Sequence, residues 1–180
     1  MLYTYVEKEI NVDILEYIRR QMAGMRRSIN GNMQNMTGEL FNYPSPGTAN
    51  TISATFVHLI YAEDEFIQGV LQGKPSVWEN GNWSDKVGIP QPPDIGEDWS
   101  AFKHQQLSIQ PQLDYAAAVW AATDTYLDTL TAEDLDRKVN FAGGERTVAD
   151  MLLLATSQAL GHNGEIAALK GVQGAKGLPI

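Results

Sequence analysis

Apolar residues recur at helical spacing in four separate stretches of the chain. The first stretch runs from Ile10 to Met36 in steps of three and four, and the second follows from about Thr51 to Leu71. Two more run from about Trp99 to Leu130 and from Thr147 to Lys170. Such steps place the apolar side chains on one face of a helix. The pattern predicts an all-α fold, a four-helix bundle, in a single domain covering residues 1–180.

Prolines and glycines separate the predicted helices. The sequence NYPSPG at residues 42–47 ends the first helix, because proline has no backbone N–H to donate. Asn11 or Asp13 is suited to cap the start of that helix. Residues 72–98 form a long connection that contains Trp78 and Trp83, and we expect these rings to anchor it to the core. Long connections usually have a function, so we expect this one to lie over the bundle as a lid.

The second half of the chain carries two further expectations. Pro111 lies inside the third apolar stretch and should kink or interrupt that helix. Two short runs flank Gly143 and Gly144, which predicts a small hairpin just before the fourth helix. The long connection leaves open whether the third helix runs parallel or antiparallel to the second.

Composition and charge narrow the class of protein. The net charge of −9 and the pI near 4.7 argue against a nucleic-acid partner, whose phosphates need a basic surface. The absence of cysteine excludes disulfides and thiolate catalysis by the protein. The chain has no apolar run long enough to span a membrane, and from the early glutamates we expect no secretory signal. We therefore expect a soluble, cytoplasmic protein with no membrane partner.

Two clusters of charge fall on predicted helices. Arg19, Arg20, Arg26 and Arg27 form the densest basic group, and Glu63–Glu65 is an acidic run. Charged side chains on a helix ordinarily lie on its solvated face. We expect both clusters at the surface, with a subunit contact as the alternative for the arginines.

Three residues are candidates for the functional site. Gln158 and His162 lie four positions apart on the fourth helix and point the same way, about 6 Å apart along its axis. His58 would face them if the second helix packs alongside. The three side chains either hold a divalent metal with an open position for a substrate, or form a polar layer that keeps the helices in register. His104, beside Lys103 and two glutamines, is expected at the surface.

Two stretches of the chain resemble a known family. They are TFVHLIYAEDEFIQGVLQGKP around His58 and GERTVADMLLLATSQALGHNGEI around His162, and they resemble the DinB-like family over nearly the whole chain. The resemblance implies a four-helix bundle, often a homodimer, with a three-histidine site for a divalent ion such as nickel or zinc. Carried over by position, the metal ligands fall on His58, Gln158 and His162. Gln158 stands where the family pattern has a histidine.

The resemblance implies two alternative functions. Characterised relatives include thiol transferases that use bacillithiol and a mycothiol-dependent isomerase. The first alternative is therefore a metal-dependent small-molecule enzyme, thiol-transferase-like or a hydrolase. The second is a metal-free small-molecule-binding or dimeric interaction module of the same fold. In both we expect a small-molecule or thiol ligand and a homodimer, the latter also because the first helix is rich in methionine.

Overall fold

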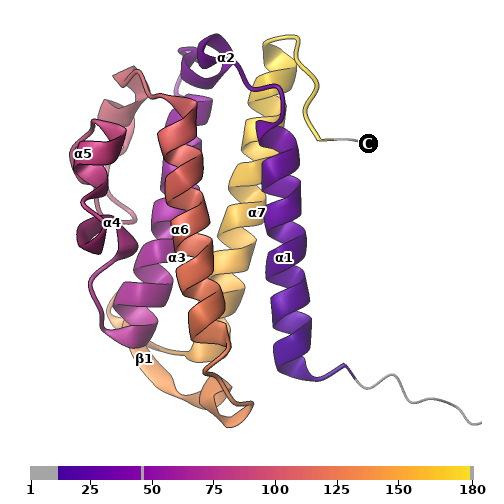
Figure 1. The fold of residues 1–180 in the computed structure, drawn as a ribbon, viewed down its shortest axis with the longest axis vertical. Helices are drawn as coiled ribbons and strands as arrows, with labels where there is room; N and C mark the ends of the chain where they lie inside the picture. Colours follow the sequence, from indigo (N-terminus) through magenta and orange to yellow (C-terminus); the bar gives the residue numbers. More distant parts are fainter. Residues whose placement is uncertain (1–11, 46, 179–180) are drawn as a thin grey trace, which may run out of the picture.

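Four long helices stand side by side as a bundle (Figure 1). The computed structural model describes residues 12–45 and 47–178. The long helices are α1 (Ile14–Met33), α3 (Ile52–Asp64), α6 (Ile109–Leu127) and α7 (Val148–Val172). The predicted all-α four-helix bundle is confirmed. Within the described residues, no helix is long and apolar enough to cross a membrane.

The long connection sets the direction of the third long helix. α3 continues as a π-helical segment, η1 (Glu65–Leu71), and the chain then crosses back along the bundle before α6 begins. Asn42, just ahead of α3, bonds the backbone of Leu107 just ahead of α6, while Arg137, after α6, bonds the carbonyl of Leu71. α6 therefore runs parallel to α3, and α1 and α7 run the opposite way (Figure 1).

The buried carboxylate of Asp64 fixes the start of the connection. It accepts hydrogen bonds from the backbone N–H groups of Val77 (2.8 Å) and Trp78 (3.0 Å) and from the hydroxyl of Tyr115 (2.7 Å). These bonds tie α4 (Val77–Asn80) to α3 and α6. Trp78 and Trp83 both pack on the ring of Tyr115, with centroids 5.0 and 5.3 Å away. The two tryptophans anchor the connection to the core, as predicted.

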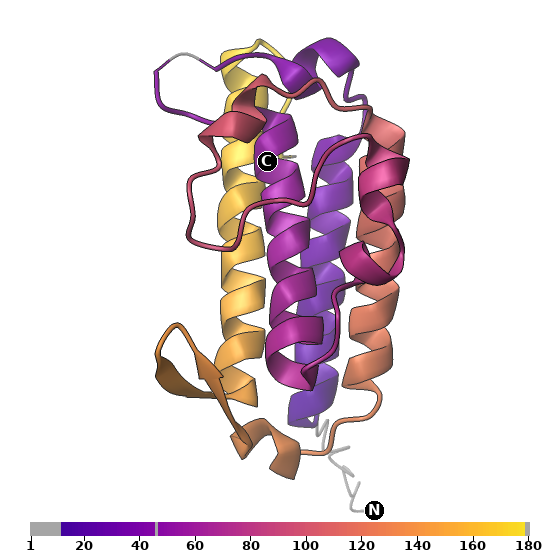
Figure 2. The ribbon, with the colours of Figure 1, turned by 90° about the vertical axis from the view of Figure 1, so that its left-hand side faces the viewer.

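Further along, the connection passes over α3. It forms α5 (Trp83–Val87), crosses α3 toward α7 and ends in a 3₁₀ helix, η2 (Ser100–His104) (Figure 2). The last part of the connection thereby reaches the face where α3 and α7 meet.

The third long helix is shorter than the sequence predicted. Residues 105–108 separate η2 from α6, so the helix predicted from about Trp99 to Leu130 is interrupted there, ahead of Pro111 and not at the proline. Pro111 is the third residue of α6 and causes no interior kink. In the first turn of a helix the N–H that proline lacks would have no partner within the helix, so proline is tolerated there.

The starts of α1 and α7 carry the caps that their sequence favours. Asp13 caps α1 by accepting a hydrogen bond from the N–H of Glu16 at 2.7 Å. Ile10, the first residue of the predicted stripe, lies outside the described residues. Thr147 and Asp150 form a reciprocal capping box at the start of α7. Four short elements complete the chain: α2 (Gly38–Asn42), the 3₁₀ helix η3 (Glu133–Asp136), and the strands β1 (Lys138–Phe141) and β2 (Gly144–Thr147). The two strands form the predicted hairpin just before α7.

Part of each predicted surface cluster is buried instead. Arg26 on α1 is only 9% exposed and donates to Glu63 on α3 at 3.0 Å and to Asp124 on α6 at 2.6 Å. Thr123 donates a further hydrogen bond to Glu63 at 2.8 Å. The prediction of solvated charge is wrong for Arg26, Glu63 and Asp64. Each of these buried charges has charged or hydrogen-bonding partners on neighbouring elements, and the spacing within one helix cannot show them.

Candidate small-molecule pocket

The structure brings the three candidate residues together where α3 and α7 pack. Because these helices are antiparallel, His58 on α3 lies opposite Gln158 and His162 on α7. The side-chain amide of Gln158 is 2.9 Å from Nε2 of His58. The rings of His58 and His162 meet nearly at right angles, with centroids 4.9 Å apart. The cluster therefore joins the two helices by direct side-chain contacts.

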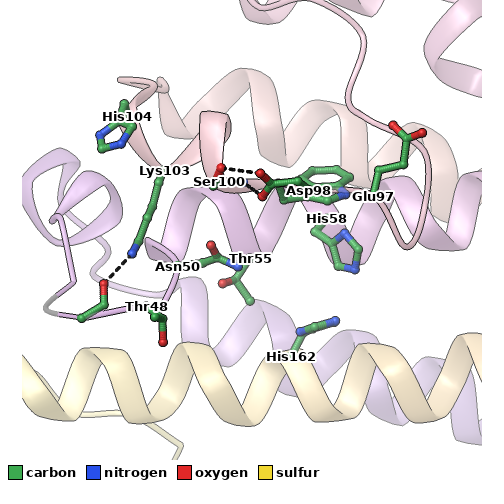
Figure 3. A pocket seen from close by; sticks show the side chains of 12 residues that line it. Thr48, Asn50, Thr55, His58, Glu97, Asp98, Ser100, Lys103, His104 and His162 are labelled. Atoms are coloured by element: carbon green, nitrogen blue, oxygen red, sulfur yellow. Dashed lines mark hydrogen bonds between the residues drawn. The ribbon is translucent and has the colours of Figure 1, made fainter.

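An open pocket of about 600 Å³ lies over this cluster. His58 and His162 form one part of its wall, and the segment from Glu97 to His104 forms another (Figure 3). Residues 47–55, between α2 and the first turn of α3, close the remaining side. The end of the connection thus covers the site. Trp78 and Trp83, which were expected in the lid, line α6 instead.

Trp99 and His104 are pocket residues that the sequence did not place in the site. Trp99 is 7% exposed and packs against His58, with ring centroids 4.5 Å apart at 85°. Its position follows from the fold of the connection, and only its place next to a predicted helix start marked it in the sequence. His104 is exposed, as predicted, and lies at the rim of the pocket.

Burial keeps His58 uncharged at neutral pH. Its pKa falls from 6.5 to about 4, chiefly because the ring loses solvent, with a further lowering from the nearby charge of His162. The carboxylate of Glu165 opposes this shift only in part. A neutral imidazole has one N–H donor and one acceptor nitrogen.

Glu165 fixes the other histidine. Its Oε2 lies 2.8 Å from Nδ1 of His162, three residues earlier on the same face of α7. A carboxylate only accepts hydrogen bonds, so Nδ1 of His162 is the donor in this pair. Nε2 of His162 makes no hydrogen bond to any described residue. The ring is thereby oriented through one nitrogen and keeps the other available.

The donor set does not fit a firmly held nickel or zinc ion. A metal-bound histidine ordinarily donates its second ring N–H to an acceptor. His162 meets this condition through Glu165, but Nδ1 of His58 is buried without a partner among the described residues. Gln158 offers only a neutral amide, a poor ligand for such ions. Across residues 12–45 and 47–178, no group of three His, Cys, Asp or Glu side chains is placed to hold an ion.

The fold and the pocket define a helical-bundle protein with a polar site between its second and fourth long helices. Residues 21–166 match the family model of the DinB superfamily, and the chain belongs to this superfamily. The fold is similar to that of a conserved protein from Enterococcus faecalis, with a TM-score of 0.76 and 22% sequence identity. The match covers 91% of this chain and 99% of the other. A comparison with curated proteins finds no match.

Proposed function

We propose that this DinB superfamily member binds a small molecule in the pocket over His58 and His162, without a divalent ion. The hydrogen bond between Gln158 and His58 carries the proposal, because it occupies the ring nitrogen that an ion would need. The unpartnered Nδ1 of His58 supports it further, because a metal-bound histidine ordinarily donates its second ring N–H to an acceptor. Volumes of 300–1,000 Å³ are typical of small-molecule sites, and this pocket falls within that range.

The pocket combines apolar and polar surface in the way that ligand sites do. Trp99 and the ring of His58 supply flat apolar surface. The hydroxyl of Thr55 and the ammonium of Lys103 add hydrogen-bonding groups on other sides of the pocket. A few such groups around an apolar surface orient a small ligand.

The second candidate is a metal-dependent small-molecule enzyme, a thiol transferase or a hydrolase. Superfamily membership supports it, and so does the pairing of His162 with Glu165, which is the arrangement found behind many metal-bound histidines. In this candidate His58, Gln158 and His162 would be the ligands of nickel or zinc.

Metal analysis of protein purified without chelator or affinity tag tests the two candidates. We expect no stoichiometric ion and no rise in melting temperature on adding nickel, zinc or manganese. One tightly bound ion per chain, with thermal stabilisation, would favour the enzyme instead. For the ligand, a fragment screen by NMR on wild type and His162→Ala should give hits that shift the pocket resonances of wild type alone. A screen without such hits would refute small-molecule binding.

We also propose that the chain forms a homodimer through the outer faces of α1 and α7. Ile14 and Tyr17 on α1 are 49% and 53% exposed, and Leu153 and Leu160 on α7 are 61% and 47% exposed. Ile14, Tyr17 and Leu153 border one apolar groove, and Leu160 lies two turns from Leu153 on the same helix face. Clusters of exposed, large apolar side chains mark association surfaces, and a two-fold dimer would cover the same face on both copies.

A further inference from the structure

The proton positions of the two pocket histidines follow from their partners. His162 carries its proton on Nδ1, because Glu165 can only accept there. In the neutral ring, Nε2 of His162 is then an acceptor with a free lone pair. Because His162 lines the pocket, that lone pair is the group of this residue that a ligand can use.

His58 has the opposite arrangement. If the amide NH₂ of Gln158 donated to Nε2 of His58, the His58 proton would lie on Nδ1, buried and without an acceptor. A buried donor without a partner costs about 1–3 kcal/mol. A half-turn of the amide exchanges its nitrogen and oxygen, so that the oxygen faces Nε2 of His58 and accepts from Nε2–H. Only a lone pair on Nδ1 is then left unpaired, and proteins tolerate unpaired acceptors better than unpaired donors.

We infer that His58 and His162 are held in opposite tautomers, and that Nε2 of His162 is the acceptor that receives a hydrogen-bond donor of the ligand. Gln158 and Glu165 are the positioning residues that fix these tautomers. The ligand class is a small molecule with a hydroxyl, thiol or amine N–H next to a flat apolar group, which Trp99 can contact. The ligand half rests on the proposed function, whereas the tautomer half stands without it.

The alternative is that Glu165 and His162 form only an ordinary side-chain pair on an exposed helix face. Such i,i+3 pairs add only about 0.2–0.5 kcal/mol to a helix and have no effect on a pocket. In that case Glu165→Ala would change stability slightly and leave the proton of His162 where it is. Stability alone therefore cannot decide the question, and the ring nitrogens have to be observed directly.

The test is ¹⁵N NMR of the histidine rings at about pH 8, where imidazole is ordinarily neutral. In wild type we expect a protonated Nδ1 and a non-protonated Nε2 for His162, and the reverse for His58. Glu165→Ala should shift His162 toward the Nε2–H form, while Glu165→Gln, which keeps an acceptor oxygen, should restore the wild-type spectrum. Glu145→Ala is the matched control, since the two side chains are 59% and 60% exposed. The same tautomer at both histidines, or no response to Glu165→Ala, would overturn the assignment.

The ligand half is tested with phenol and its methyl ether, anisole. The two probes have the same flat ring, but only phenol has an O–H donor. We expect phenol to shift the Nε2 resonance of His162 in wild type, and anisole to leave it in place. Equal shifts from both probes, or none from phenol, would refute the donor requirement. In either case the tautomers measured without ligand stay as an independent result.

Discussion

Gln158 is the residue on which the character of the pocket depends. Its amide bonds Nε2 of His58 at 2.9 Å, which satisfies that buried nitrogen by a hydrogen bond. An imidazole at position 158 would instead add a third nitrogen ligand on the face already shared with His162. In the metal-free pocket that we propose, a single amide separates a hydrogen-bonded cluster from a metal site on the same backbone.

His58 should make the stability of the protein depend on pH. Its pKa is about 4 in the folded chain, so its stabilising contribution is complete above the unfolded value of about 6.5. The contribution is lost as the pH falls toward and through 4, because over this range the unfolded chain binds a proton at His58 and the folded chain does not. In urea melts, the free energy of unfolding of wild type should fall from pH 7 to pH 5 by about 1 kcal/mol more than that of His58→Gln. This figure is roughly half of the change that a fully buried ring with the same pKa shift would give, because the ring of His58 is partly solvated.

Parallel losses in wild type and His58→Gln would contradict the burial of a neutral His58. His104→Gln is the control, because it removes an exposed histidine at the rim of the pocket. It reports the effect of losing a histidine that is not buried.

Spacing in the sequence found His58, Gln158 and His162, because helical periodicity fixes which residues share a face. It did not find the tautomers of the two rings, which depend on partners contributed by different turns and helices. Trp99 was also missed as a pocket residue, since it reaches His58 only through the path of the long connection. Contacts between segments far apart in sequence have no local signal.

At the scale of elements, Asp64 holds the connection against the bundle. Its side chain has zero exposure, and burial raises its pKa against the opposing effect of its hydrogen bonds to Val77, Trp78 and Tyr115. The residues that cover the pocket lie further along this connection. Loss of the hydrogen bonds to Asp64 should therefore also affect the position of the segment from Glu97 to His104.

Asp64→Ala should destabilise the protein by roughly 2–4 kcal/mol, because it removes the acceptor of two backbone N–H groups at the start of α4 and leaves the buried hydroxyl of Tyr115 unpaired. Hydrogen exchange should show the backbone amides of Val77 and Trp78 losing protection first. Asp85→Ala, an exposed change in α5, serves as the control and should have little effect. Equal protection of these two amides in Asp64→Ala and wild type would show that α4 is held by other contacts.

The boundaries of the four long helices were less predictable than their number. The stripes of apolar residues gave four long helices because burial of one face requires that repeat. The same stripes joined η2 to α6, since the residues between them keep an apolar rhythm while the backbone leaves the helix. The π-helical segment after Asp64 also had no sequence signal, because a π-helix contains the same types of residue as an α-helix.

For the whole molecule, the outer faces of α1 and α7 predict a dimer. Sedimentation should show a wild-type dimer, and Leu153→Glu should dissociate it, because burying a charge in an apolar contact is costly. Val172→Glu is the control, since Val172 is exposed on α7 but points away from the face of Leu153 and Leu160. A wild-type monomer at all concentrations, or a dimer unaffected by Leu153→Glu, would refute this interface.

The most direct measurement is a calorimetric titration of zinc and nickel into wild type and Gln158→His. We expect the variant to bind one ion per chain, because it presents three imidazoles with an open position toward the pocket. Under the same conditions wild type should show no stoichiometric binding, since Gln158 is a weak ligand and Nδ1 of His58 has no acceptor. One ion per wild-type chain, bound as tightly as in Gln158→His, would contradict the metal-free pocket.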